Sequence, residues 1–343
     1  MSTAIDVPDE TRADPPGAGD GRPAGSLRGL DLALPGRLAL AVVGGLCVWL
    51  TFPDANVPAL GPVGVALLSA AILGTRPRTA AILGLVGGLA CFVPTLSWSG
   101  IFVGPVPWLA LATVEALYVA AMCALVAAIH RRLLRRPPTA ARDALVALAV
   151  PLGWVAQEWL RGSWPFGGFP WARLAFGQTD GPLLRLAALG GAPLVTFAVA
   201  AIGAALHLLV VTRWTRPELL RYGAAPAAAL ALVLLAVTAT PVPTDGTPTP
   251  LTLVQGNTPR EGLDFNAERR AVLDNHVRGT QRAAERDGTP PAAYLWPENS
   301  SDIDPLRNPD AAARIEKAVA DDLAERSGTF STSEIGARIR ERL

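Results

Sequence analysis

A single carboxylate stands just after a strand-like run in the last third of the sequence. Residues 292–300 read Ala-Ala-Tyr-Leu-Trp-Pro-Glu-Asn-Ser, and the apolar part stops at Pro297, one residue before Glu298. Because proline donates no backbone hydrogen bond, the strand should end there and a loop should carry Glu298. A carboxylate at a strand end, backed by Trp296, suits a general base in a partly dry site. A solvated loop glutamate is the alternative that these residues leave open.

The cysteines suggest no second kind of chemistry. Cys47, Cys91 and Cys123 each fall inside an apolar run, where a small buried side chain is the simplest interpretation. Neither a disulfide framework nor a metal cluster is indicated. We therefore expect no metal and no other cofactor.

The composition indicates a polytopic membrane protein. Half of the 343 residues (50%) are hydrophobic and only 17% are charged, which is too apolar for an ordinary soluble chain. The formal net charge of +1 gives no electrostatic argument for a nucleic-acid partner. The membrane itself is the expected environment.

Seven apolar runs approach the length of about 20 residues that a bilayer-spanning helix needs. They are Leu34–Phe52, Val57–Gly74, Ala80–Leu96, Val106–Ile129, Ala144–Leu160, Pro193–Val211 and Ala224–Thr238. We expect a disordered tail over residues 1–33, which shows no signal-peptide pattern, and a transmembrane domain over 34–240. A separate domain should follow over 241–343.

The arginines predict the orientation of this bundle. They gather in every second connection between the runs, while the first and third connections carry none. The basic connections contain Arg76 and Arg78, then Arg131, Arg132, Arg135, Arg136 and Arg142, then Arg213, Arg216 and Arg221. Since basic loops stay inside, the tail should be cytoplasmic and Glu298 should lie on the extracytoplasmic face of the inner (plasma) membrane.

One external connection, Arg161–Ala192, is unlike the others. It is dense in aromatic, proline and glycine residues and cannot form a regular helix. Its rings suit the headgroup level of a bilayer, and we expect Trp164, Phe169 and Trp171 to contact a lipid substrate. One interpretation is a re-entrant floor under a lipid-binding site, and the other is an aromatic belt that only anchors the loop.

Two acidic residues lie in or near the spans. Glu115 is close to the middle of its run, so it must be protonated, paired or exposed to a wet cavity. Glu158 and Arg161 are three residues apart and can pair on one helix face.

After a Pro/Thr-rich linker at 240–250, the pattern becomes that of a small α/β domain. Strand-like runs at Leu251–Gln255 and 292–296 alternate with polar helical runs at Asn266–Arg286 and Pro309–Ala324. This order predicts a parallel strand pair. Two strands alone are too few for independent stability.

Taken together, these motifs resemble the apolipoprotein N-acyltransferase family. The matching residues are Gly167-Gly-Phe-Pro-Trp171 with Gly177-Gln-Thr-Asp-Gly-Pro182, then Leu253-Val-Gln-Gly-Asn257 with Pro259, and Trp296-Pro-Glu298. The resemblance implies a nitrilase-like (carbon–nitrogen hydrolase) domain outside a helical membrane bundle. It also implies that a phospholipid acylates a cysteine, and that the amino terminus of a diacylated apolipoprotein then takes the acyl group.

Within this resemblance, Glu298 matches the general base of a Glu-Lys-Cys triad. The triad lysine would stabilise the oxyanion and the cysteine would carry the acyl group. Phe265 stands where the family typically has a tryptophan, so we count it among the substrate-binding candidates. No cysteine follows Glu298, and the only lysine, Lys317, lies in the next helix and is not assigned to the triad. We therefore expect a C-terminally truncated or frameshifted member that is inactive alone.

Two other classes of protein remain open. A membrane-tethered carbon–nitrogen hydrolase would need the same missing cysteine, and it would leave the aromatic connection without a purpose. A non-catalytic or degenerate membrane protein, or a transporter, would account for Glu115 and the spans. No inverted repeat supports the transporter.

Overall fold

A computed structural model describes residues 32–211 without Pro138, residues 246–257 and 265–286, and residues 291–327 without Asn299 and Asp302. Isolated residues at 227, 231, 234, 237, 238 and 240 are also described. The predicted disordered tail at 1–31 and the segment 328–343 lie outside the described residues. The chain divides into two compact units, residues 1–92 with 113–240 and residues 93–112 with 241–343.

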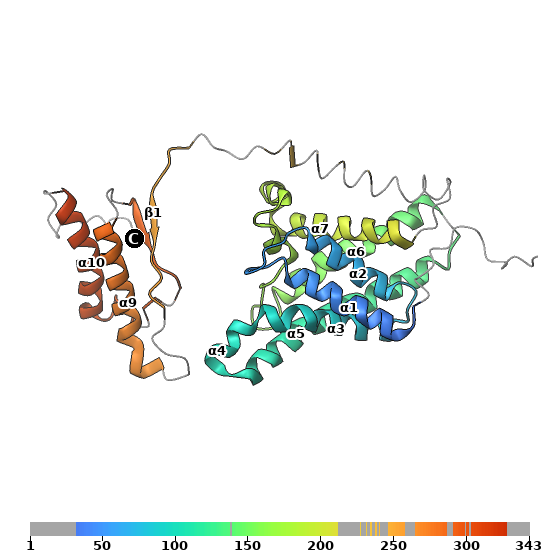
Figure 1. The fold of residues 1–343 in the computed structure, drawn as a ribbon, viewed down its shortest axis with the longest axis horizontal. Coiled ribbons are helices and arrows are strands. Elements are labelled where there is room, and N and C mark those ends of the chain that lie inside the picture. The colour runs from blue at the N-terminus through green and yellow to red at the C-terminus, as the bar shows by residue number, and fades with distance from the viewer. Residues whose placement is uncertain are drawn as a thin grey trace, which may run out of the picture. The chain divides into compact units, whose positions relative to one another are not determined.

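The first unit is a bundle of apolar helices (Figure 1). Its helices are α1 (Leu34–Trp49), α2 (Leu60–Ile72), most of α3 (Pro77–Thr95), most of α5 (Pro105–Leu133), α6 (Ala140–Arg161) and α7 (Ala187–Val211). Helix α2 packs against both α1 and α7, and α7 packs against α6.

Three helical segments are long and apolar enough to cross a membrane. They are Pro77–Thr95, Pro105–Leu133 and Pro182–Leu208, while α1 and α2 are apolar but shorter. Each apolar run predicted between Leu34 and Val211 coincides with a helix. The seventh predicted run, Ala224–Thr238, lies mostly outside the described residues. A helical membrane protein is thus supported, and the number of seven spans stays a prediction.

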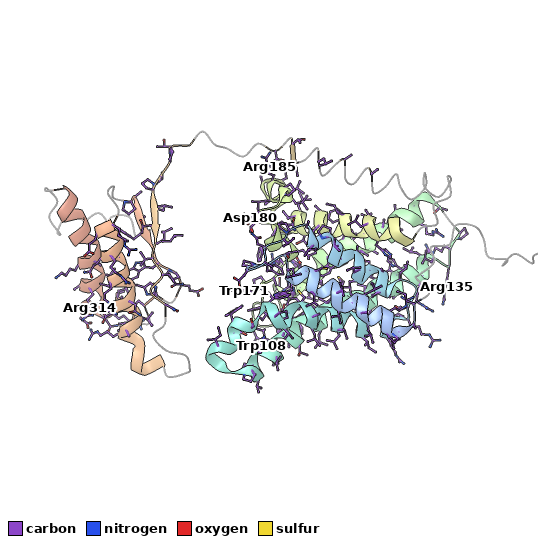
Figure 2. The ribbon with its side chains drawn as sticks, in the orientation of Figure 1. Trp108, Arg135, Trp171, Asp180, Arg185 and Arg314 are labelled. Carbon is purple, nitrogen blue, oxygen red and sulfur yellow. The ribbon has the colours of Figure 1, made fainter. Side chains whose placement is uncertain are left out.

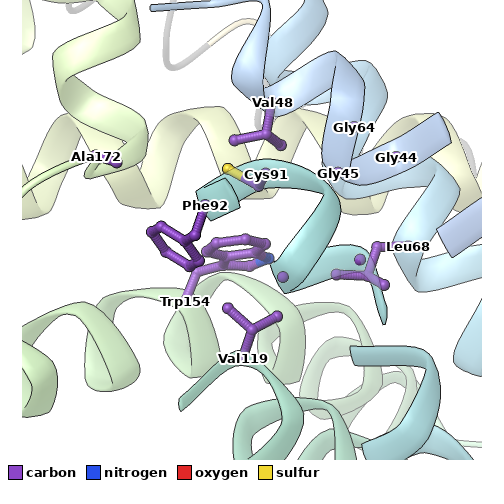
Figure 3. Close-up of a pocket in the computed structure, with 12 residues that line it drawn as sticks. Gly44, Gly45, Val48, Gly64, Leu68, Cys91, Phe92, Val119, Trp154 and Ala172 are labelled. Atoms are coloured by element: carbon purple, nitrogen blue, oxygen red, sulfur yellow. The ribbon is translucent and has the colours of Figure 1, made fainter. Parts of the chain in front are cut away.

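Small residues allow the helices of this unit to approach closely. A Cβ atom added at Gly45 would lie 2.1 Å from the carbonyl oxygen of Gly87, and one added at Gly64 would lie 2.6 Å from that of Gly44. Such backbone-to-backbone contacts between small residues are how helices associate in lipid. They leave an apolar cavity of about 20 Å³ that Cys91, Phe92 and Trp154 help to line (Figure 3).

The second unit begins with the turn between α3 and α5. It contains a 3₁₀ turn at Ser97–Ser99 and the short helix α4 (Gly100–Val103). The indole Nε1 of Trp108 donates a 2.9 Å hydrogen bond to the carbonyl oxygen of Val93. This bond ties the start of α5 to the end of α3.

The remainder of this unit has the predicted β-α-β-α order. Strands β1 (Leu251–Leu253) and β2 (Ala293–Leu295) pair in parallel, with Leu251 opposite Ala293 and Leu253 opposite Leu295. Helices α9 (Phe265–Arg286) and α10 (Pro309–Ser327) pack together and are bridged by the ion pairs Arg270–Asp310 and Arg314–Asp274.

The two faces of the small sheet differ. Val254, just after β1, is buried and would touch a side chain placed at Gly279 of α9. Leu253 points the other way and is 78% exposed, and Leu295 beside it is 45% exposed. Alternation of side chains along a strand therefore places one face on the helix and leaves the other without a partner among the described residues.

Candidate functional site

The aromatic loop, defined here as residues 162–173, follows the last residue of α6. Its irregular backbone agrees with the prediction: the Trp164–Pro165 peptide is cis, and Phe166, Gly167 and Gly168 have φ values of 54°, 91° and 79°. The loop runs into two 3₁₀ turns, Leu174–Gln178 and Pro182–Leu186, before α7 begins. Helix α7 starts earlier than predicted, and it is broken at Gly190 and Gly191.

A buried guanidinium holds this loop to the helix end. Arg161 is 1% exposed, and its Nη1 donates to Oε2 of Glu115 at 2.7 Å. The same group donates to the carbonyl oxygens of Phe169 at 3.2 Å and Trp171 at 2.6 Å, while Nη2 donates to that of Ala172 at 3.0 Å. One side chain thus joins α5, α6 and three loop carbonyls.

The environment of this guanidinium explains why it tolerates burial. Glu115 is 2% exposed and neutralises the charge, and the Cζ atom of Arg161 lies 5.2 Å from the centre of the Phe92 ring. A buried charge is stable only when it is paired and hydrogen-bonded, and here Glu115 and the loop carbonyls meet both Nη groups. The Nε–H of Arg161 is buried without a hydrogen-bond partner among the described residues. Removing one partner of such a pair typically costs about 3–5 kcal/mol.

A second buried carboxylate holds the end of the loop. Glu158 is 4% exposed, and its Oε1 accepts a 2.8 Å hydrogen bond from the backbone N–H of Leu174. Its Oε2 accepts a 2.7 Å hydrogen bond from the hydroxyl of Thr196 on α7. The predicted direct contact between Glu158 and Arg161 is not formed, because Arg161 bonds to Glu115 while Glu158 bonds to Leu174 and Thr196. The opposite charges of Glu158 and Arg161 still attract each other.

The aromatic side chains of the loop face outward. Trp164 is 64% exposed, Trp171 is 52% exposed and Phe166 is fully exposed. The ring of Phe169 stacks on that of Trp171 with centroids 6.0 Å apart. The phenol of Tyr118 donates a 2.6 Å hydrogen bond to the carbonyl oxygen of Trp164. The three predicted aromatic candidates therefore lie on one short segment. Hydrogen bonds from Tyr118 and Arg161 hold the backbone of this segment to the bundle.

The segment after the loop is anchored to the turn between α1 and α2. The side-chain amide of Gln178 donates to the carbonyl oxygen of Pro58 at 2.9 Å, and Asn56 donates to the carboxylate of Asp180. A Cβ atom at Gly177 would lie 2.1 Å from the hydroxyl of Thr51. These contacts give the Gly177–Pro182 motif a structural role.

The two ends of the bundle carry different residues. Trp171 and Asp180 lie at one end of the first unit, and Arg135 lies at the other (Figure 2). This separation is what alternating basic and aromatic connections require.

The second candidate region is the end of strand β2. Glu298 lies in a turn and is exposed. Trp296 turns its indole to helix α9 and donates a 2.9 Å hydrogen bond to the hydroxyl of Thr280. Its ring centre lies 5.4 Å from that of His276, which is 2% exposed. The tryptophan is thus engaged with the helix, and the expected partial burial of Glu298 is not found.

His276 also meets the end of strand β1. A Cβ atom placed at Gly256 would lie 2.5 Å from Nδ1 of His276, so only glycine fits there without movement. The Nδ1 atom lies 2.9 Å from the carbonyl oxygen of Val272 in the preceding helical turn. The residues just after both strands therefore contact one histidine, His276. The sequence analysis missed it because it lies inside an ordinary polar helix.

Two further residues considered in the sequence analysis lie on the helices of the second unit. Phe265 is the first residue of α9, and its side chain is not described. Lys317 lies exposed on α10. The sequence singled out Arg161 but not its pairing with Glu115, for which a signal existed because an acid within a span requires a partner.

The comparisons with known proteins agree with one another. A family model of the apolipoprotein N-acyltransferase N-terminal domain matches residues 44–205. A protein of Mycolicibacterium smegmatis named apolipoprotein N-acyltransferase is 43% identical over 318 residues, which make up 84% of this chain and 50% of that protein. Proteins with the same name from Photobacterium profundum and Methylococcus capsulatus are 31% and 32% identical, each over 77% of this chain and 49% and 51% of their own length. This chain thus spans about half the length of the curated relatives it matches.

Proposed function

Because this chain belongs to the apolipoprotein N-acyltransferase family, we propose that it serves the N-acylation of the diacylglyceryl-cysteine amino terminus of apolipoproteins. A phospholipid is the proposed acyl donor, and a cysteine thioester is the proposed intermediate. The observation that carries the proposal is the aromatic loop, which exposes its rings while a buried ion pair and buried hydrogen bonds hold its backbone to the bundle.

The proposed reaction has two steps. A thiolate attacks the ester carbonyl of the phospholipid, a carbon–sulfur bond forms, and the lysophospholipid leaves as an alcohol after taking up a proton. The α-amine of the apolipoprotein then attacks the thioester, an amide forms, and the thiol returns. A general base is required in both steps, first for the thiol and then for the amine.

Glu298 is the residue that we propose as this base. It lies three residues after the end of β2, a parallel strand whose carboxyl end lies beside that of β1, and side chains at such strand ends meet at one edge of a sheet. The turn leaves its carboxylate exposed to an incoming partner. Trp296 and His276 fix the backbone just before it.

The aromatic loop is the proposed lipid-contacting surface. Trp164 and Trp171 present amphipathic rings of the kind that lie at membrane interfaces, and Phe166 adds an apolar ring beside them. A site at the interface avoids drawing acyl chains into water, which costs about 0.8 kcal/mol per methylene. The arginine pattern and the separation of Arg135 from Trp171 support an extracytoplasmic, inner-membrane placement of this surface.

The thiol cannot come from the three cysteines of this chain. Cys91 and Cys123 are buried in α3 and α5, and Cys47 lies in α1, so all three thiols belong to apolar helices of the bundle. We therefore expect the 343-residue polypeptide alone to form no thioester with phospholipid, as measured by intact mass spectrometry. A hydroxylamine-sensitive mass increase of one acyl chain would show that one of these thiols does react.

A chimera tests the function itself. Residues 1–298 of this chain are joined to the C-terminal half of the Mycolicibacterium smegmatis relative, in a host lacking its own N-acyltransferase. We expect mass spectrometry to find triacylated lipoprotein. The matched control is the same chimera with Glu298→Gln, which should leave the lipoprotein diacylated. An inactive chimera that is correctly inserted and folded, or an active Glu298→Gln control, would contradict the proposal.

A further inference from the structure

We infer that Glu115 and Arg161 are positioning residues for the aromatic loop. From inside the bundle, they hold the backbone that carries the proposed lipid-contacting rings. Both side chains are buried, at 2% and 1% exposure, so neither can meet a lipid or a peptide directly. Their effect on a substrate can pass only through the loop backbone that Arg161 holds.

The geometry argues for a positioning role. Three of the four acceptors of Arg161 are main-chain carbonyl oxygens, those of Phe169, Trp171 and Ala172. The position of a main-chain carbonyl oxygen does not depend on the rotamer of its side chain. Hydrogen bonds to these oxygens therefore fix the backbone of the loop. The donors sit on a planar group, which presents them in a fixed directional array.

Glu115 completes the arrangement by orienting the guanidinium. Its Oε2 accepts a hydrogen bond from Nη1 of Arg161, the group that also donates to the carbonyl oxygens of Phe169 and Trp171. Without this carboxylate, Arg161 would keep its donors but lose the anion that balances its buried charge. Glu115 therefore supplies the negative charge that lets the buried Arg161 be stable within the bundle.

The tip of the loop makes few contacts, although backbone hydrogen bonds also hold its two ends, such as that from the N–H of Phe169 to the carbonyl oxygen of Arg161 at 2.7 Å. Phe166 makes the tip and is fully exposed, and a Cβ atom at Gly167 would find nothing within 4 Å. The backbone that carries the exposed rings is held by Arg161 near one end and by the Tyr118 bond to Trp164 near the other. The inference rests on the proposed function only where it takes these rings as the surface that meets the lipid.

A spin-label experiment separates loop positioning from general stability. The three native cysteines are replaced by alanine, and a nitroxide is attached at Phe166→Cys on the loop or at Leu189→Cys on α7. Leu189 is 62% exposed and serves as the matched control site. The protein is placed in lipid nanodiscs, and the mobility of each label is read by electron paramagnetic resonance.

The decisive variant is Glu115→Leu combined with Arg161→Met. Replacing both members of a buried ion pair by apolar residues of similar size usually preserves stability, whereas removing one member does not. The double variant should therefore unfold at the parent temperature. The three loop carbonyls, however, lose their donors, so the label at residue 166 should become more mobile while the label at residue 189 stays unchanged.

Other outcomes would overturn the inference. A label at residue 166 that stays as immobile as in the parent would show that the pair serves only the stability of the bundle. An equal rise in mobility at residues 166 and 189 would show a general loosening. The measurement uses no turnover, so it can fail while the acyltransfer chimera works, and the reverse also holds.

Discussion

The phenol of Tyr118, on helix α5, donates a 2.6 Å hydrogen bond to the carbonyl oxygen of Trp164 in the aromatic loop. These residues are 46 positions apart in the chain. The bond lies one helical turn from Glu115, so a single face of α5 holds the loop at two places.

Tyr118→Phe should loosen the start of the loop without unfolding the bundle. A neutral hydrogen bond contributes about 0.5–1.5 kcal/mol, and the phenyl ring keeps its apolar contacts. We expect the unfolding temperature to change little and the nitroxide at residue 166 to become more mobile. Unchanged mobility would mean that Arg161 alone orders the loop.

Gly168→Ala should destabilise the protein more than Gly167→Ala. Both glycines have positive φ, at 79° and 91°, so alanine is strained at either position by about 1–3 kcal/mol. A Cβ atom at Gly168 would also lie 2.2 Å from the backbone carbon of Gly162, whereas one at Gly167 meets nothing within 4 Å. Thermal unfolding in detergent measures the difference. Equal losses would show that the loop moves aside freely.

Thr196→Val should weaken the attachment of α6 to α7. The hydroxyl of Thr196 donates to the buried carboxylate of Glu158, and hydrogen bonds to charged groups contribute about 1.5–3 kcal/mol. Valine has nearly the same shape and removes only the donor. Urea or thermal unfolding should show the loss, and Thr196→Ser should restore most of the stability. Failure of serine to do so would point to packing of the methyl group.

Gly256→Ala should displace the end of β1, because the new methyl group would overlap the ring of His276 at 2.5 Å. His276→Ala removes that ring and makes room. The two changes should therefore be non-additive, with the double variant less perturbed than the sum of the single ones. Hydrogen–deuterium exchange over residues 251–257 and 293–298 gives the measurement. Simple additivity would contradict the contact.

Local pattern decided most of the secondary structure. Apolar runs long enough for a bilayer became helices between Leu34 and Val211, since backbone groups in lipid must bond within their own segment. Alternating strands and polar helices after residue 250 predicted the parallel pair of β1 and β2, because a helical crossover joins parallel strands. The proline after Trp296 placed Glu298 in a turn.

Only the tertiary structure decided the partners. The sequence by itself required that Glu115 be paired, protonated or exposed to a water-filled cavity. The local spacing favoured Glu158 as the partner of Arg161. The fold instead brought Arg161 to Glu115 across 46 positions and sent Glu158 to Leu174 and Thr196. Spacing along one helix shows which residues share a face. Which buried charge meets another depends on how separate helices pack, because each buried charge and donor must find a partner in three dimensions.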